Sequence, residues 1–280
     1  MLKESFGLNI VLKHKRINFP DASTHYYCDA ARFFFKIKDV ACYEVCAKSN
    51  TIFIDMDPAL REPKLVLTWL NGTVLAYLLQ YHDFLVLHAS AIVVHGQAVL
   101  FCGPSGQGKS TLAATMNQKG YPFLTDDLAV VRFHDQQMEL MPMSTSAKLW
   151  TDTLAYLGKS SDALQPISHR PGKFELPIEH AWKHPIQISR VYELHVDNRQ
   201  GIIKETPVYN FDKIQLLIRN TYRYSMLKAL GKLNLHLQHV THMASAIPCY
   251  QLTRPDNLAC FDEFGTWLDA QLNEDKKTAK

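Results

Sequence analysis

The residues of this chain with the clearest chemical potential form a glycine-rich loop. The stretch GPSGQGKS matches the pattern GxxxxGK[ST], and it stands between an apolar run and a segment of helical composition. Glycines let backbone N–H groups turn toward an anion, and the N-terminus of the following helix adds partial positive charge. In such loops the lysine bridges the β- and γ-phosphates and the hydroxyl ligates Mg²⁺. We predict a nucleotide–Mg²⁺ site made by Gly103, Ser105, Gly106, Gln107, Gly108, Lys109, Ser110 and Thr111, although Thr111 could equally be a residue of the first helical turn.

Two adjacent aspartates follow a short apolar run just beyond this loop. They are Asp126 and Asp127, at the end of YPFLTDD. In phosphoryl transfer one carboxylate can hold Mg²⁺, while a second can take the proton of the attacking hydroxyl. Ligands bind at the carboxyl ends of strands in open α/β sheets, so both groups are expected beside the γ-phosphate. Spacing alone does not divide the two roles, and one aspartate could instead cap the next segment.

The elements around these residues indicate an α/β fold. Residues 1–63 read as short strands, and KLVLTWLNGTVLAYLLQ predicts a buried helix over 64–80 that is interrupted at Gly72. Residues 84–101 predict strands that turn at His95 and Gly96, followed by a helix that stops at Gly120 and by the strand YPFLT. A strand, a loop, a helix and a further strand are typical of a parallel α/β unit.

The second half of the chain is less regular. Residues 133–209 give a mixed signal, while FDKIQLLIRNTYRYSMLKALG predicts one helix that ends at Gly231. PCYQLTR predicts a strand and NLACFDEFGTWLDAQL a final helix. We therefore expect a small β-rich N-terminal domain over 1–82 that ends in a buried helix, a P-loop domain over 83–275 and a frayed tail over 276–280.

Composition excludes several classes of protein. The 280 residues are 47% hydrophobic and 20% charged, with a net charge of only +3, which argues against a dedicated nucleic-acid binder. The six cysteines form no CxxC pair, no apolar run is long enough for a membrane span, and no signal peptide is visible. A reduced cytoplasmic protein without membrane or nucleic-acid partners is expected. Cys42 and Cys46 lack a second pair that would complete a zinc site.

One stretch resembles a known family. LHASAIVVHGQAVLFCGPSGQGKSTLAATMNQKGYPFLTDD, residues 87–127, is similar to the catalytic core of HPr kinase/phosphorylase. The resemblance implies a P-loop core of the HPr-kinase/PEP-carboxykinase-like type that uses ATP and Mg²⁺. It also implies roles: His88 is the active-site histidine, Asp126 takes the proton from the acceptor serine, Asp127 lies with Ser110 on the metal side, and Lys109 holds the phosphates. Without the resemblance, His88 reads as a packed strand residue.

The resemblance is incomplete outside this core. The chain lacks an IRGLG-like stretch, and its N-terminal segment is shorter than the family's separate N-terminal domain. This layout resembles the branch that phosphorylates the C-terminal serine of lasso-type precursor peptides. The leading hypothesis is an ATP-dependent serine kinase acting on such a ribosomally made peptide, and homo-oligomers are possible. The alternatives are an HPr serine kinase in carbon regulation and a P-loop ATPase or switch that has no phosphoryl acceptor.

Other charged residues are weaker candidates. Arg170 and Lys173, in HRPGKFELP, could bring positive charge to the γ-phosphate or to an acceptor carboxylate, or lie on a solvated loop. Arg219 and Arg223, four apart on the predicted helix, are interpreted as a solvated face. In HLQHVTH only the first two of His236, His239 and His242 could share a helix face as metal ligands.

Overall fold

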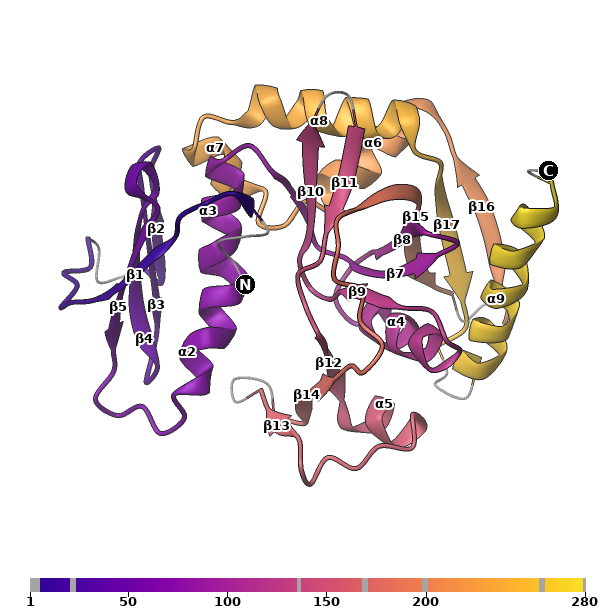
Figure 1. The fold of residues 1–280 in the computed structure, drawn as a ribbon, viewed down its shortest axis with the longest axis horizontal. Helices are drawn as coiled ribbons and strands as arrows, with labels where there is room; N and C mark the ends of the chain where they lie inside the picture. The colour runs from indigo at the N-terminus through magenta and orange to yellow at the C-terminus, as the bar shows by residue number, and fades with distance from the viewer. Residues whose placement is uncertain are drawn as a thin grey trace. The chain divides into compact units, whose positions relative to one another are not determined.

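The computed structural model describes residues 6–20, 24–134, 137–167, 171–197, 201–256 and 260–278 (Figure 1). The chain forms two compact units. The first takes in Met1–Val86 and Tyr222–His239, and the second takes in Leu87–Thr221 and Val240–Lys280. The sequence placed the boundary between residues 82 and 83, and it did not predict that residues 222–239 return to the first unit.

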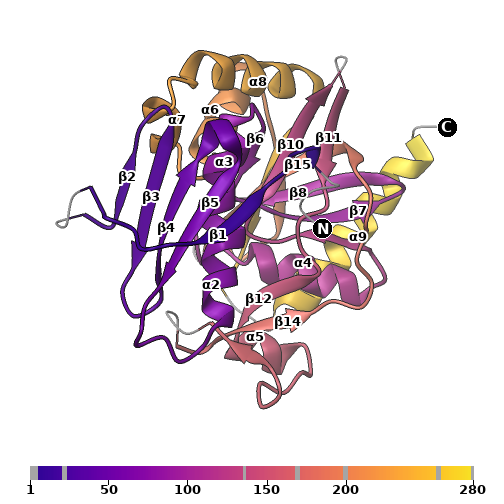
Figure 2. The ribbon, with the colours of Figure 1, turned by 60° about the vertical axis from the view of Figure 1, so that its left-hand side comes forward.

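A sheet and a broken helix make up the core of the first unit (Figure 2). Five strands of the described residues lie in the order β1 (Val11–His14), β5 (Thr51–Met56), β4 (Ala41–Cys46), β3 (Arg32–Ile37) and β2 (Tyr26–Cys28), with β1 parallel to β5 and the other pairs antiparallel. A short 3₁₀ turn, η1 (Ala47–Ser49), joins β4 to β5. Aromatic residues on alternate positions of β3 face the helix, and Phe33 stacks on Tyr77 with ring centroids 4.9 Å apart.

The helix predicted over residues 64–80 is confirmed, including its break. It runs as α2 (Lys64–Trp69), a π-helical turn η2 (Leu70–Val74) and α3 (Leu75–Tyr81), and Gly72 has the non-helical angles φ −100° and ψ −107°. The returning segment packs on this break, because Tyr222 Oη lies 3.3 Å from Thr73 Oγ1 and the Gln80 amide donates to Tyr222 O at 2.7 Å. The segment continues with α7 (Ser225–Ala229) and the start of α8 (Leu233–Ala246).

The second unit is built on a mixed sheet. Among the described residues this sheet has nine strands, and its longest path is β6 (Leu85–Leu87), β10 (Ala129–His134), β11 (Gln137–Met141), β15 (Ile186–Val196), β8 (Gln97–Cys102), β7 (Ser90–Val94) and β9 (Phe123–Thr125). β17 (Cys249–Arg254) pairs with β15, and β16 (Lys204–Val208) pairs with β17. A separate three-stranded sheet has the order β12 (Ser146–Trp150), β14 (Lys173–Pro177) and β13 (Gln165–Pro166).

The predicted parallel unit around the glycine-rich loop is confirmed in strand direction, but its two strands are not neighbours in the sheet. The strand before the loop, β8, and the strand before the aspartates, β9, do not pair with each other, because β7 lies between them and is antiparallel to both. The hairpin that joins β7 to β8 turns at His95 and Gly96, as predicted, and both residues have positive φ. Local sequence favours this hairpin but does not reveal which other strand pairs with β7.

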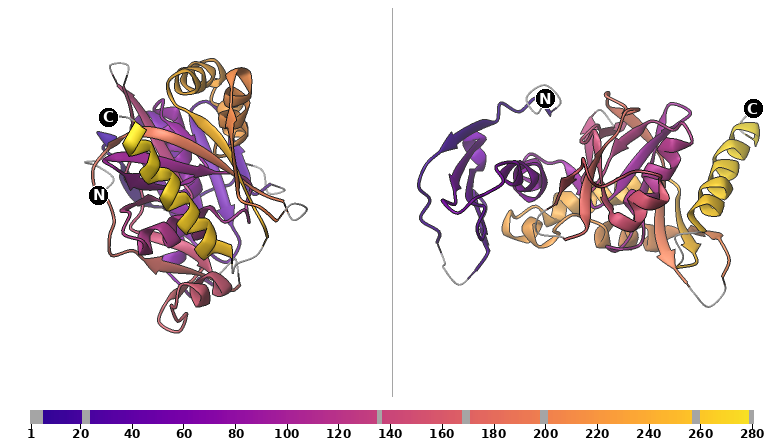
Figure 3. Two further views of the ribbon diagram at one scale, coloured as in Figure 1. Left: turned by 90° about the vertical axis from the view of Figure 1, so that its right-hand side faces the viewer. Right: turned by 90° about the horizontal axis from the view of Figure 1, so that it is seen from below.

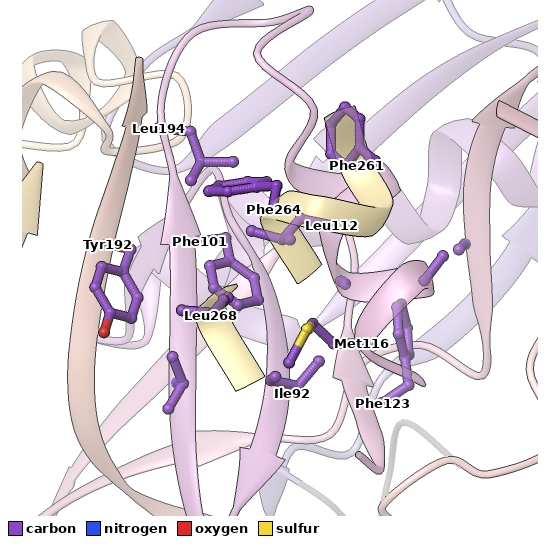
Figure 4. Packing of buried hydrophobic residues seen from close by; sticks show 14 of the residues in the cluster. Ile92, Phe101, Leu112, Met116, Phe123, Tyr192, Leu194, Phe261, Phe264 and Leu268 are labelled. Atoms are coloured by element: carbon purple, nitrogen blue, oxygen red, sulfur yellow. The ribbon is translucent and has the colours of Figure 1, made fainter. Parts of the chain in front are cut away.

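Two helices cover one face of this sheet. α4 (Lys109–Gln118) and α9 (Cys260–Thr278) contribute to one hydrophobic cluster together with β7 and β8 (Figure 4). Phe264 and Leu268 of α9 are fully buried there against Leu112 and Met116 of α4. The left view of Figure 3 shows α9 running across the unit. The short helix α5 (Thr151–Tyr156) adds Leu154 to the same cluster.

The single helix predicted between Phe211 and Gly231 is wrong. The chain forms α6 (Asn210–Arg219), leaves the helix at Asn220 and begins α7 at Ser225. Thr221 instead forms an isolated antiparallel bridge with Leu87. Helical spacing of apolar residues cannot reveal this break, because the partners that cause it lie far away in sequence. No helix of the described residues is long and apolar enough to span a bilayer.

Candidate functional site

The glycine-rich loop leaves β8 and enters α4, as the sequence predicts. Gly103, Gly106 and Gly108 have φ of 126°, 89° and 92°, which lie in the region that disfavours other residues. Lys109 folds back over the loop, and its Nζ donates to Gly103 O at 2.7 Å and to Pro104 O at 3.0 Å. Burial lowers the pKa of this ammonium group. A bound phosphate would have to replace these carbonyls as the partner of Lys109.

Two of the loop glycines are also required by packing. A Cβ on Gly103 would lie 2.8 Å from Leu194 O, and a Cβ on Gly108 would lie 2.6 Å from the Phe261 ring. Arg254 is buried behind the loop, where its guanidinium lies 4.4 Å from the centre of the Phe261 ring and donates to Gln107 O at 3.1 Å. The rear of the loop is therefore held by β17 and α9.

The other predicted loop residues differ in exposure. Ser105 and Gly106 are exposed, whereas Ser110 and Gln107 are partly buried. Thr111 is 8% exposed, and its hydroxyl lies 3.3 Å from that of Thr153 in α5. Its contact with α5 favours the alternative in which Thr111 is a residue of the first helical turn.

The antiparallel course of β7 brings a third strand end to this site. β8 and β9 both end at the edge where β7 begins, so residues that precede and open β7 meet the loop and the aspartates. Ser90 is the first residue of β7 and His88 lies two positions before it. The site therefore lies where β8 and β9 end and where β7 begins.

Asp126 lies in the interior of this arrangement. It is 7% exposed and accepts three hydrogen bonds. Ser90 Oγ and Ser110 Oγ each donate to its Oδ1 at 2.7 Å, and the Lys148 backbone N–H donates to its Oδ2 at 2.8 Å. Most of the lone pairs of this carboxylate are thus directed at groups that fix it in place.

Asp127 has a different environment. Its backbone has φ of 71°, and its side chain is 30% exposed. His88 Nδ1 lies 3.2 Å from one carboxylate oxygen, and Lys148 Nζ lies 3.0 Å from the other. Burial alone would raise the pKa of the Asp127 carboxyl, but the hydrogen bond to His88 and the charge of Lys148 hold it well below its ordinary value. Asp127 is therefore an ionised carboxylate.

The family resemblance implied that Ser110 lies with Asp127, and that His88 orients Asp126 or the substrate hydroxyl. In the structure Ser110 contacts Asp126, and His88 contacts Asp127. The positive φ of Asp127 turns the chain directly after β9. Lys148 contacts both carboxylates, through its backbone N–H at Asp126 and through its Nζ at Asp127.

Two residues of the site were missed by the sequence analysis. Ser90 shares the strand context LHAS with His88, and its position two residues further on could have indicated it. Lys148 lies in AKLW on β12 and has no motif around it. It reaches the aspartates only through the packing of β12 beside α4.

The remaining basic candidates are placed as follows. Lys173 begins β14 opposite Trp150, and its Nζ lies 5.6 Å from the centre of that indole. The charge of Lys173 contributes to lowering the pKa of Lys109, after the larger effect of burial. Arg170 lies outside the described residues.

Arg219 and Arg223 are both exposed, as the sequence predicted, but each also binds a partner. Arg219 forms a two-pronged pair with the buried Glu193 carboxylate, with its Nε 2.6 Å from Oε1. Arg223 donates to Thr73 Oγ1 at 3.1 Å and lies over the ring of Phe35. Helical spacing placed both on one face, but the helix ends between them.

The oxygens of Ser110 and Asp126 fit a magnesium ion. A hydroxyl and a carboxylate are hard ligands, and Mg²⁺ in nucleotide sites takes one or two such groups together with phosphate oxygens and waters. No cluster of three or more His, Cys, Asp or Glu side chains in the described parts of the chain is placed to hold a metal by itself. His236, for example, lies buried against Tyr224, and burial lowers its pKa to about 4.

Sequence comparison gives weak similarity to two kinds of protein. The chain is 34% identical to the HPr kinase/phosphorylase of Chlorobium phaeovibrioides over 61 residues, which are 22% of this chain and 18% of that one. It is 27% identical to Protein VirB11 of Agrobacterium fabrum over 158 residues, which are 54% of this chain and 44% of that one. The chain thus spans less than half of the length of these curated relatives. No protein-family model matches it.

A comparison of structures finds the Hpr(Ser) kinase/phosphatase from Coxiella burnetii. The TM-score is 0.38 at 10% identity, over 70% of this chain and 99% of that one. This likeness is too low to carry an argument about function.

Proposed function

We propose that this protein is an ATP-dependent kinase that phosphorylates a serine hydroxyl. The observation that carries the proposal is the division of two adjacent carboxylates between two environments at a glycine-rich phosphate loop. Asp126 is joined to Ser110, and Asp127 is joined to His88 and Lys148. Similarity to an HPr kinase/phosphorylase over 61 residues supports the same class of reaction.

The geometry supports a particular division of roles. Asp126, with Ser110, would hold Mg²⁺, which when bound supplies charge neutralisation on the phosphates. Asp127 would accept the proton of the attacking hydroxyl, because its carboxylate is more exposed and is not enclosed by three donors. His88 would orient that carboxylate, and Lys109 would bind the transferred phosphate. This division exchanges the roles that the family resemblance gave to the two aspartates.

The depressed pKa of Asp127 is compatible with this role. Phosphoryl transfer proceeds through a loose transition state in which the acceptor proton is removed late, so a positioned and ionised carboxylate suffices. Lys148 Nζ is a hydrogen-bonding neighbour of Asp127, and a phosphate would compete for its charge. Release of Lys148 would raise the pKa of Asp127 and make it a stronger base.

The acceptor proposed here is a ribosomally made precursor peptide with a C-terminal serine. Its support is the family resemblance together with Lys148 and Lys173, two cations on neighbouring strands that suit the carboxylate of such a terminus. HPr is the alternative acceptor, and hydrolysis of ATP by water is the alternative reaction.

The test is phosphorylation in vitro followed by mass spectrometry. The protein is incubated with MgATP and either a peptide ending in serine, the same peptide with a C-terminal amide, or HPr. We expect phosphate on the terminal serine and a weaker reaction with the amide. Release of phosphate from ATP at the same rate with and without an acceptor would instead support an ATPase.

Two substitutions separate the roles of the aspartates. Asp127→Asn should reduce transfer by about 10²-fold to 10⁴-fold, the usual contribution of general base catalysis, and leave MgATP affinity near that of the unmodified protein. Asp126→Asn should weaken MgATP binding itself, measured by calorimetry with and without Mg²⁺. An active Asp127→Asn protein together with an inactive Asp126→Asn protein that still binds MgATP would restore the original assignment.

A further inference from the structure

Asn220, the residue at which α6 ends, contacts two parts of the candidate site and the buried Glu193 carboxylate. Its side-chain Oδ1 accepts the backbone N–H of Gly103, the first residue of the phosphate loop, at 2.8 Å. Its backbone carbonyl accepts the N–H of His88 at 2.8 Å. Its Nδ2 donates to Glu193 Oε1 at 2.8 Å and to Leu216 O at 2.9 Å. Asn220 is 5% exposed, so no solvent replaces these partners.

Glu193 is the buried anion of this group. It lies on β15 directly opposite Cys102, the last residue of β8, and is 1% exposed. Its carboxylate is bound by Arg219 on both oxygens, by His195 at 2.9 Å and by Asn220. Burial alone would raise the pKa of Glu193, but the hydrogen bonds from Arg219, His195 and Asn220 lower it to about 2. The group is therefore charged under ordinary conditions.

The charge of Glu193 determines which way the Asn220 amide points. An ionised carboxylate only accepts hydrogen bonds, so the NH₂ end of the amide must face it. The oxygen of the same amide then faces Gly103. The amide orientation that lets Asn220 donate to Glu193 is thus the same orientation that lets it accept the N–H of Gly103.

We propose that Asn220 is a positioning residue that fixes the phosphate loop and His88 relative to each other, with Glu193 and Arg219 as the pair that orients its amide. The inference rests on the proposed function in one respect, which is that the loop binds MgATP. It predicts that changes at Asn220 and Glu193 alter nucleotide affinity through hydrogen-bond complementarity, although neither residue belongs to the loop.

A double-mutant cycle tests this inference by calorimetric measurement of the Kd for MgATP. Asn220→Asp keeps an oxygen for Gly103 but sets two carboxylates against each other, so we expect binding about tenfold to a hundredfold weaker. Glu193→Gln alone keeps one oxygen for Asn220 but removes the second oxygen that Arg219 binds, so we expect a smaller weakening of binding than in Asn220→Asp. In the double variant the amide introduced at position 193 can donate to the new carboxylate, and Kd should return to within about threefold of the Glu193→Gln protein.

The pH dependence gives a readout that a purely structural defect would not produce. Two facing carboxylates share a proton as pH falls, so the defect of Asn220→Asp should shrink between about pH 8 and about pH 6. Tyr121→Phe is the matched control, because it removes a hydrogen bond to Asp269 in the same unit, away from the loop, and should leave Kd unchanged. If thermal unfolding shows that Asn220→Asp does not fold, Asn220→Ser removes the reach to Gly103 without adding charge and should weaken binding about tenfold.

The outcomes separate this inference from the proposed function. An unchanged Kd in both Asn220 variants, or a double variant no better than Asn220→Asp, overturns the positioning role. If the cycle behaves as expected but no acceptor is phosphorylated, the positioning role stands and the proposed transfer reaction fails. An unmodified protein that does not bind MgATP overturns both.

Discussion

Asp127 is held as an anion by two neighbours that act in different ways. His88 contributes a hydrogen-bonding contact, and Lys148 contributes a full charge at 3.0 Å. The stability that this interaction gives is present above the ordinary carboxyl pKa of about 4 and is lost as pH falls below it toward the depressed value. His88 and Lys148 together thus lower the pH at which this carboxylate becomes protonated, and the His88 hydrogen bond is the larger of the two effects.

Replacing Lys148 should raise that pH. In Lys148→Met the pKa of Asp127 rises, so the acid limb of kcat/KM should shift upward by about one pH unit or more, the usual effect of an adjacent opposite charge. The contact with Asp126 is retained, because it uses the backbone N–H. Lys15→Met, which breaks the pair with Glu44 in the other unit, is the control. An acid limb identical to that of the unmodified protein would contradict the role of Lys148.

Short-range features of these residues were visible in the sequence, and long-range pairing was not. The glycine-rich loop, the break at Gly72 and the turn at His95 and Gly96 are local, because each depends on residues within a few positions. The exchange of partners between Asp126 and Asp127 depends on β12 and β7, which reach the aspartates only in the folded chain. The ion pair of Glu193 with Arg219 likewise joins residues that are 26 positions apart.

At the scale of elements, the rear of the glycine-rich loop is a packing surface for α9. Gly108 needs both its left-handed φ and the absence of a Cβ, since the Phe261 ring of α9 would lie 2.6 Å away. Gly96 has a similar φ of 77°, but nothing lies within 4 Å of its Cβ position. Both glycines therefore need a positive φ, but only at Gly108 would a Cβ also collide with a neighbouring side chain.

This contrast gives a matched pair of substitutions. Gly96→Ala should cost about 1 kcal/mol from backbone strain alone. Gly108→Ala should cost about 1–3 kcal/mol more, because the collision adds overpacking, and it should also abolish MgATP binding. Tm by differential scanning fluorimetry should fall by about 2–4 °C for each kcal/mol. Equal falls in Tm for the two variants would show that α9 moves away from the new Cβ without further destabilising the protein.

At the scale of the whole molecule, the candidate site lies entirely within one of the two units. The loop, both aspartates, His88, Lys148 and Asn220 all belong to Leu87–Thr221. The division of the chain could not be predicted in full from the sequence, because residues 222–239 join the first unit by packing on the break at Gly72. Nothing in their composition distinguishes them from the helices on either side.

Nucleotide binding should therefore protect the backbone amides of the loop from hydrogen exchange. At a MgATP concentration of about 100 times Kd, binding stabilises the native state by about 2.7 kcal/mol. Hydrogen–deuterium exchange should slow at the amides of Gly103 to Ser110 and at the start of α4. Unchanged exchange at these amides, at a concentration that saturates binding by calorimetry, would place the nucleotide elsewhere.

The left-handed turn at Asp127 also has a consequence for how the position tolerates mutation. Its φ of 71° suits glycine, asparagine and aspartate and disfavours β-branched residues. In a saturation library, abundance at this position should therefore rank Gly and Asn beside Asp, while activity should retain Asp alone. Abundance and activity then give two different substitution profiles at position 127. The difference between the two profiles measures how strongly the reaction, rather than folding, requires aspartate there.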